Sequence, residues 1–218
     1  MAQVDLLRSL PRTKRNLEKR AQAKNPAVVA IAKQYGEQYF DGPREFGYGG
    51  YRYDGRWLPV ARDIVAHFGL KPDMRVLDVG CAKGFLVKDL MQVCPGLEAF
   101  GVEISEYALM NCAPEVIGRL HLGSADHLPF PDRGFDCVLS INTIHNLARP
   151  RAKTALGEIQ RLSGGRAFVQ VDSYLDPAQK EIFESWVLTA EFHDYPDGWL
   201  RLFAEAGYTG DYDWTIVD

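Results

Sequence analysis

The sequence predicts an α/β fold in which a mostly parallel sheet of seven strands carries helices on both faces. Two observations lead to this prediction. From residue 75 onward, short apolar runs alternate with segments of helical spacing, and strands separated by helices pair in parallel. The first run, MRVLDVG, ends at Gly80 in a turn of small residues, which is typical of the ligand edge of an open parallel sheet.

The remaining elements are expected in a regular order. Before the sheet, we expect a moderately helical arm over 5–24, interrupted by Pro11, and helical spacing over 27–40. Strands are expected at residues 75–80, 97–104, 119–123, 135–141 and 165–171, with a last strand or strand pair at 208–218. Helices are expected at residues 58–68, 84–93, 149–162 and 197–206, and in an insertion over 172–195. Ser105 is suited to cap a helix after the second strand.

Length and composition favour one globular domain with an N-terminal extension. The chain has 218 residues, of which 46% are hydrophobic and 25% are charged, as in ordinary globular proteins. We divide it into a basic arm and Gly/Tyr-rich lid at 1–55 and a ligand-binding domain at 56–218, within which residues 172–195 form a cap.

Charge is distributed unevenly along the chain. Seven basic and two acidic residues lie within 1–25, a net charge of +5, whereas the rest carries −9 and the whole chain −4. Three interpretations of the arm stay open: a solvated basic helix, contact with the acidic body of a second subunit in a homodimer, or a grip on a phosphorylated or nucleotide-linked substrate. The net charge and the single basic segment argue against nucleic acid as a partner.

The cysteines and the N-terminus bear on the compartment. Cys81, Cys94, Cys112 and Cys137 form no C-x-x-C pair and no grouping with histidine that suits a metal, so we expect free thiols. The N-terminus lacks the apolar core of a secretion signal, and no apolar run approaches the ~18 residues of a membrane span. We therefore expect a cytoplasmic protein that binds neither a metal nor a membrane.

The first strand and its turn carry the strongest functional signal. The spacing is Gly-x-Ala-x-Gly over Gly80, Ala82 and Gly84, not the G-x-G-x-x-G of a dinucleotide site. Asp78 lies at the strand end, where its carboxylate suits a cationic ligand and would repel a pyrophosphate; alternatively, it organises the loop through backbone N–H groups. Glu103 ends the second strand, where a carboxylate can accept both hydroxyls of a ribose or can be an ordinary polar strand end.

These features resemble the class I S-adenosylmethionine-dependent methyltransferases, particularly their small-molecule, type 11-like group. The matching segments are VLDVGCAKG, GVEIS and GSADHLPFPDRGFDCVLS, in that order, and the resemblance covers residues 56–171. It implies the Rossmann-like fold of that family and S-adenosyl-L-methionine as cofactor, with S-adenosyl-L-homocysteine as its product. The departures are Ala82, where glycine is usual, and Lys83, which we expect to point outward or to meet an anionic substrate.

The resemblance also implies a set of cofactor-binding residues. It puts an aspartate, here Asp126 beside His127, at the adenine amino group; a surface loop acid is the alternative. The residues expected to bind the cofactor are Asp78, Gly80, Cys81, Ala82, Gly84, Glu103, Ile104, Ala125, Asp126, His127 and Asn142.

The loop after the fourth strand holds the candidate catalytic residue. Methyl transfer is an in-line displacement, so close alignment supplies much of the catalysis, and a hydroxyl nucleophile also benefits from a base. His145 is the candidate base because histidine titrates near working pH; alternatively, it caps or packs the loop. His193 and Asp194, in the cap, form a second candidate pair.

The segment 39–57 is dense in glycine and aromatic residues, and we interpret it as a lid over cofactor and substrate. Glycines permit unusual backbone angles, aromatic rings offer faces for stacking, and Arg44, Arg52 and Arg56 can bind anions. The alternative is a structural loop whose rings pack under the domain. The residues expected to contact substrate are Tyr48, Tyr51, Arg52, Tyr53, Asn146, Tyr174 and His193.

Together these features predict a methyltransferase for a small molecule. Our first choice is O-methylation of a sugar, a nucleotide-linked sugar or a natural-product intermediate, with an anionic or phosphorylated acceptor. The alternatives are a methyltransferase acting on RNA or protein, and a non-catalytic regulatory module that binds S-adenosylmethionine or a nucleotide. An NAD-dependent dehydrogenase or epimerase is disfavoured, because its glycine spacing and a Tyr-x-x-x-Lys pair are absent from the sequence.

Overall fold

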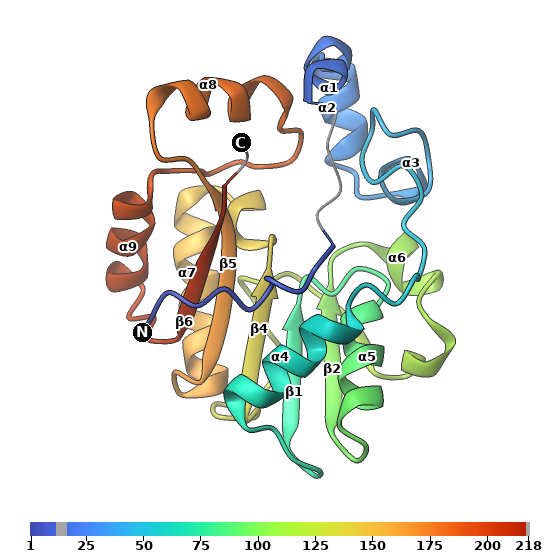
Figure 1. Ribbon diagram of the computed structural model, residues 1–218, viewed down its shortest axis with the longest axis vertical. Helices are drawn as coiled ribbons and strands as arrows, with labels where there is room; N and C mark the ends of the chain where they lie inside the picture. The colour runs from blue at the N-terminus through green and yellow to red at the C-terminus, as the bar shows by residue number, and fades with distance from the viewer. Residues whose placement is uncertain (12–16, 217–218) are drawn as a thin grey trace.

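The structure, a computed structural model, describes residues 1–11 and 17–216 and is built around one parallel sheet (Figure 1). The strand order is β3-β2-β1-β4-β5-β6. The strands are β1 (Arg75–Val79), β2 (Glu98–Glu103), β3 (Leu120–Leu122), β4 (Cys137–Ile141), β5 (Ala167–Ser173) and β6 (Asp211–Ile216). All five pairings are parallel, so the predicted α/β class and Rossmann-like layering are confirmed.

The number of strands differs from the prediction. The described residues form six strands instead of seven, because only β6 follows the last helix. The outer edge of β6 is paired with the N-terminal segment: Val4 N–H donates to the Tyr212 carbonyl at 2.9 Å, and Tyr212 N–H donates to the Ala2 carbonyl at 3.0 Å. A covered edge presents fewer unpaired backbone groups, and here residues 2–4 lie where a further strand would pair.

Helices cover both faces of the sheet, as predicted. The helices are α1 (Leu17–Ala23), α2 (Pro26–Ala32), α3 (Glu37–Phe40), α4 (Leu58–Phe68), α5 (Phe85–Val93), α6 (Glu106–Met110), α7 (Arg149–Ser163), α8 (Pro177–Trp186) and α9 (Pro196–Glu205), with short 3-10 turns at Pro114–Val116 and Ile144–Asn146. Helices α4 and α5 pack on one face and α7 and α9 on the other. Within β5, Phe168 packs in the core under α4 and α5, and Val169 packs in the core under α7 and α9. Successive side chains of a strand point to opposite faces of the sheet.

Local signals in the sequence set several helix ends. Ser105 caps α6 by accepting a hydrogen bond from Ala108 N–H, as predicted. Asn25 and Asp176 cap α2 and α8 in the same way, and α4 ends at Gly69 in the left-handed region. Of the predicted basic arm, residues 12–16, which include Arg12, Lys14 and Arg15, lie outside the described residues.

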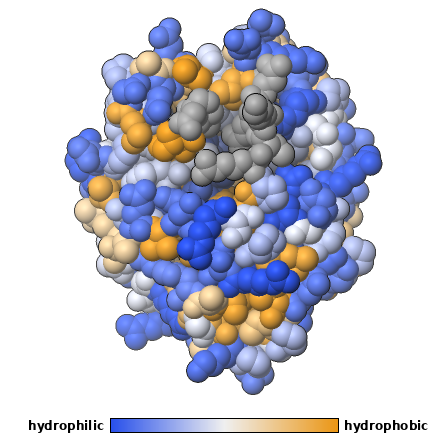
Figure 2. Space-filling model, in the orientation of Figure 1, coloured by the Kyte–Doolittle hydropathy of each residue, from blue (hydrophilic) through white to orange (hydrophobic). Residues whose placement is uncertain are grey.

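The carboxyl ends of the strands face a second group of elements, which consists of α1, α2, α3 and α8 (Figure 1). Helix α8 occupies residues 177–186 of the predicted insertion and contacts α1. Figure 2 shows that the hydrophobic residues visible on this face lie in separate groups among hydrophilic ones. None of the described helices is both long and apolar enough to cross a membrane.

Candidate functional site

The loop between β1 and α5 turns sharply at the carboxyl edge of the sheet. Gly80, Ala82 and Gly84 all have positive φ, at +86°, +50° and +73°, which L side chains rarely adopt. A Cβ at Gly80 would collide with the side chain of Thr143 from the loop after β4. Glycine is therefore required at Gly80, both for its backbone angle and because two loops meet there.

Asp78 is a buried carboxylate at the end of β1. It is 5% exposed, and none of the hydrogen bonds found among the described residues ends on its oxygens. Burial and the nearby Glu103 carboxylate raise the pKa of Asp78 to about 7. A buried anion without donors is costly, so this position is suited to a cationic ligand group.

Glu103, at the end of β2, holds the loop in shape. Its Oε2 accepts the Ala82 N–H at 2.8 Å and its Oε1 accepts the Ser105 N–H at 2.9 Å. Burial raises the pKa of Glu103, while these backbone hydrogen bonds oppose the shift. Each carboxylate oxygen has a second lone pair, so the predicted contact with ribose hydroxyls is compatible with this geometry. The next residue, Ile104, leaves 52% of its surface exposed.

Asp126, predicted to face an adenine, is held by an arginine that was not predicted as its partner. Arg151 binds it through two nitrogens, at 2.6 Å to Oδ2 and 3.0 Å to Oδ1, and Ser124 Oγ also donates to Oδ1. These contacts lower the pKa of Asp126 to about 2. Of the predicted neighbours, Ala125 is buried and His127 exposed. Arg151 lies in the first turn of α7, where the helix dipole disfavours a cation. An arginine at such a position indicates an acidic partner nearby.

His145, the candidate base, is buried against the end of β5. Its Nδ1 accepts the Asp172 N–H at 3.1 Å, and its Nε2 lies 3.5 Å from Asp172 Oδ2. The first hydrogen bond assigns the ring proton to Nε2. Neither ring nitrogen therefore has a free lone pair with which to take a proton from a methyl acceptor. Burial lowers the pKa of His145, and Asp172 partly opposes the shift. This geometry favours a positioning role for His145 over a general-base role.

The two asparagines beside His145 shape the same loop. Asn142 has a positive φ of +53°, and its Oδ1 accepts the Thr215 hydroxyl at 2.9 Å. Asn146 donates weakly to the Asn142 carbonyl at 3.4 Å, while its buried Oδ1 has no partner among the described residues. Asn146 therefore retains a free acceptor, which suits the substrate contact predicted for it.

The predicted lid, residues 39–57, lies partly against the body of the protein. Tyr51 stacks on Phe85 of α5, with ring centroids 4.9 Å apart, and Tyr48 lies 4.5 Å from Tyr51. Tyr53 donates its hydroxyl to Asp89 at 2.7 Å, while Arg52 is exposed. The other two lid arginines are engaged locally, Arg44 with the carbonyls of Gly47 and Tyr48 and Arg56 with Asp54.

The structure contradicts the expectation that Lys83 points outward, while its contact with an anionic substrate stays a prediction. Its side chain is 8% exposed, and its Nζ lies 2.6 Å from Asp41 Oδ2, in the lid. The sequence offered one clue to this pair, because a lysine beside a site for a cation needs a neutralising partner. The identity of that partner depends on contacts 42 residues apart.

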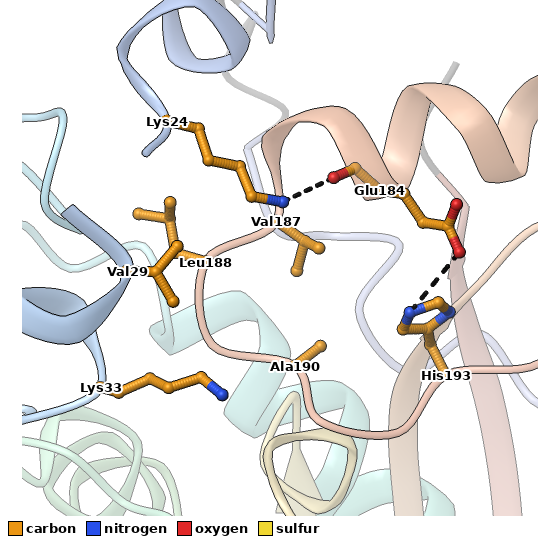
Figure 3. A pocket seen from close by; sticks show the side chains of 8 residues that line it. All are labelled: Lys24, Val29, Lys33, Glu184, Val187, Leu188, Ala190 and His193. Carbon is orange, nitrogen blue, oxygen red and sulfur yellow. Dashed lines mark hydrogen bonds and ion pairs between the residues drawn. The ribbon is translucent and has the colours of Figure 1, made fainter. Parts of the chain in front are cut away.

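A pocket of about 270 Å³ lies between the N-terminal helices and the cap (Figure 3). Lys24 and Lys33 reach it from the helical side, and His193 bounds it from the cap. His193 Nδ1 shares a hydrogen bond of 3.1 Å with the hydroxyl of the buried Tyr174, just after β5. The other lining residues are Val29, Glu184, Val187, Leu188 and Ala190. Of the predicted substrate contacts, His193 lines this pocket, with Tyr174 behind it.

Part of the chain is similar to known methyltransferases. Residues 77–169 match the family model of a methyltransferase domain. Demethylmenaquinone methyltransferase of Symbiobacterium thermophilum is 37% identical over 123 residues, 51% of this chain and 48% of that protein. Sterol 24-C-methyltransferase of Schizosaccharomyces pombe is 31% identical over 107 residues, 45% of this chain and 27% of that protein. The chain thus spans less than half the length of either relative.

Solved structures resemble the fold at lower identity. A chain of the complex between the Haloferax volcanii Trm112 methyltransferase activator and a methyltransferase aligns with a TM-score of 0.55 and 21% identity, covering 67% of this chain and 66% of that one. The YcgJ protein of Bacillus subtilis aligns with a TM-score of 0.52 and 17% identity, covering 67% and 66%. The family match shows a methyltransferase domain at residues 77–169, and the solved structures share the fold of this chain.

Proposed function

We propose that this chain binds S-adenosylmethionine at the β1–β2 edge and methylates a small molecule held under the cap. The observation that supports this proposal most strongly is Asp78, a buried carboxylate that receives no hydrogen bond from the described residues. S-adenosylmethionine carries an ammonium and a sulfonium, and its electrophilic methyl group is the chemistry that it would supply. Asp78 would bind the ammonium, which would supply the positive counter-charge that this buried carboxylate lacks.

The residues around Asp78 fit the remainder of the cofactor. The positive φ angles at Gly80 and Gly84 let the backbone approach a ligand closely. Glu103 keeps lone pairs for ribose hydroxyls, and the exposed Ile104 offers an apolar surface for an adenine ring. Asp126 would meet the adenine amino group only by sharing its carboxylate with Arg151.

The acceptor would enter through the pocket between the N-terminal helices and the cap. Lys24 and Lys33 supply ammonium groups there, and each makes one hydrogen bond among the described residues while retaining further donors. This arrangement supports the preference for an anionic or phosphorylated acceptor. Asn146, with its unpartnered buried Oδ1, is suited to receive a hydrogen bond from the acceptor.

Catalysis would rest mainly on alignment. Among the described residues, the ring nitrogens of His145 contact only Asp172, and its carbonyl accepts the N–H groups of Glu191 and Phe192. His145 would therefore hold the loop after β4 against β5 and the cap, and fix where the acceptor lies. Holding two reactants in line can replace much of the work of a base. A hydroxyl of a sugar, a nucleotide-linked sugar or a natural-product intermediate remains our proposed acceptor group.

Calorimetry followed by a turnover assay tests the proposal. The wild-type chain should bind S-adenosylhomocysteine and give no comparable heat with NAD or ATP. Labelled S-adenosylmethionine should then transfer its methyl group to a member of a panel of neutral, acidic and phosphorylated sugars and metabolites. Tighter binding of NAD than of S-adenosylhomocysteine would overturn the cofactor assignment. Binding of S-adenosylhomocysteine without turnover on any acceptor would favour the regulatory-module alternative.

A further inference from the structure

Asp41, at the start of the lid, is the centre of a small polar cluster. Its Oδ2 accepts hydrogen bonds from Lys83 Nζ at 2.6 Å and from the Tyr107 hydroxyl at 2.8 Å, and its Oδ1 accepts the Tyr51 N–H at 3.1 Å. The contacts with Lys83 and Tyr107 lower the pKa of Asp41, against the opposing effect of desolvation. One carboxylate therefore ties together groups that are distant in the sequence.

Each partner of Asp41 belongs to a different part of the cofactor site. Lys83 lies in the loop between Ala82 and Gly84, and Tyr107 lies in α6, which follows Glu103. Tyr51 belongs to the lid, and its ring stacks on Phe85 in the first turn of α5. The cluster thus joins the lid to both loops that surround the proposed cofactor site.

The pair of Asp41 and Lys83 also controls charge at that site. The Lys83 side chain is 8% exposed, and removing its partner would leave a buried ammonium uncompensated, which is costly. The same ammonium would act on a cationic ligand bound to the adjoining loop. In the intact pair, the carboxylate of Asp41 neutralises it at 2.6 Å.

We propose that Asp41 is a positioning residue, which holds Tyr51 and the lid over the cofactor loop and cancels the charge of Lys83 so that the loop accepts a cation. This inference rests on the proposed use of S-adenosylmethionine. It has two separate consequences. Loss of the pair loosens residues 39–57. Loss of the pair also weakens the binding of S-adenosylmethionine more than that of S-adenosylhomocysteine, because only the former carries the sulfonium charge.

The test compares Asp41→Asn, Lys83→Met and the double variant. Asp41→Asn keeps an oxygen for the Tyr51 N–H but loses the charge. We expect hydrogen exchange of residues 39–57 in the ligand-free protein to quicken about tenfold in Asp41→Asn while exchange in β4 and β5 is unchanged. The affinity for S-adenosylhomocysteine should fall about tenfold, and that for S-adenosylmethionine at least about twofold further.

The double variant and a matched control sharpen the result. In Asp41→Asn/Lys83→Met, the affinity ratio between the two ligands should return to the wild-type value, because no uncompensated charge remains. Asp54→Asn removes an exposed ion pair within the same lid and should change neither exchange nor affinity. Wild-type exchange in Asp41→Asn, or an unchanged ligand ratio, would overturn the inference. The exchange measurement needs no ligand, so it tests the cluster even if the wild-type chain fails to bind S-adenosylhomocysteine.

Discussion

The two halves of the sheet's carboxyl edge satisfy their polar groups in different ways. At β1 and β2, Glu103 is bonded to backbone N–H groups nearby, and Asp78 receives no hydrogen bond from the described residues. At β4 and β5, the His145 ring accepts the Asp172 backbone N–H, and Asn142 accepts the hydroxyl of Thr215 in β6, although the buried Asn146 Oδ1 and Gln170 Oε1 have no partner among the described residues. A buried charge without a partner indicates a ligand, whereas the paired groups of the second half indicate positioning.

We call the β1–β2 end of this edge the cofactor half and the β4–β5 end the acceptor half. Replacing Gly80 by alanine should have the largest effect on ligand binding, through the cofactor half. The new Cβ would collide with Thr143 at a positive φ of +86°, so the two loops must separate. We expect the affinity for S-adenosylhomocysteine to fall by about a hundredfold or more, measured by calorimetry. Gly118→Ala is the matched control: its φ is +82°, but nothing lies within 4 Å of the added atom. It should cost about 1–2 kcal/mol of stability with unchanged affinity. Equal affinity in both variants would contradict this reasoning.

Substitution of His145 distinguishes positioning from base catalysis in the acceptor half. His145→Asn can keep an acceptor for the Asp172 N–H, so we expect its kcat to lie within about threefold of wild type. His145→Ala loses that hydrogen bond, and its kcat should fall about tenfold. A general base would lose about 10²–10⁴-fold in both variants. Large, equal losses would restore the base role. His121→Asn, on the exposed strand β3, controls for the loss of a ring.

Substitution of the two lysines that line the pocket tests whether the acceptor half recognises an anion. For the best acceptor of the panel, Lys24→Met/Lys33→Met should raise KM about tenfold, because two cations leave the pocket. The affinity for S-adenosylhomocysteine should stay at the wild-type value. Lys153→Met removes an exposed lysine of α7 and serves as control. An unchanged KM would show that the acceptor binds elsewhere.

A further effect concerns the stability of the ligand-free protein. The native pKa of Asp78 is raised to about 7 from an ordinary value of 3.8, so between these values the native state holds a proton that the unfolded chain has released. Stability should therefore fall as pH rises from about 4 to about 7, by up to ~1.4 kcal/mol per pH unit. Denaturant unfolding of wild type and Asp78→Asn isolates the contribution, since the variant should lack it. Parallel pH profiles would rule it out.

The sequence predicted the backbone at the ends of β1 and β2 well because its signals are local. The strand that ends at Asp78, the small residues after it and the cap at Ser105 each depend on neighbours within a few positions, and their spacing indicates the turn directly. The parallel pairing of the strands follows from alternating strands and helices. The seventh strand was predicted wrongly, because the N-terminal segment that pairs with β6 lies more than 200 residues away in the sequence.

The acceptor half could not be predicted to the same depth, because its contacts are long-range. The contact of His145 with Asp172 spans 27 residues, and Lys24 reaches the Glu184 carbonyl across 160. At the β1–β2 edge, the pair of Lys83 with Asp41 spans 42 residues and was missed for the same reason. Residue type alone marked His145 and Lys83 as unusual. Only the folded arrangement indicates which group neutralises the lysine and which hydrogen bond occupies the histidine.

The most direct test of the central claim is the pH dependence of S-adenosylhomocysteine binding in wild type and Asp78→Asn. A cationic ligand group needs the Asp78 carboxylate ionised, and with a pKa of about 7 the ionised fraction rises roughly tenfold between pH 6 and pH 8. Calorimetry should therefore show wild type binding roughly tenfold more tightly at pH 8, and Asp78→Asn binding weakly at both. If Asp78→Asn matches wild type at pH 8, Asp78 does not bind the cofactor and the account fails.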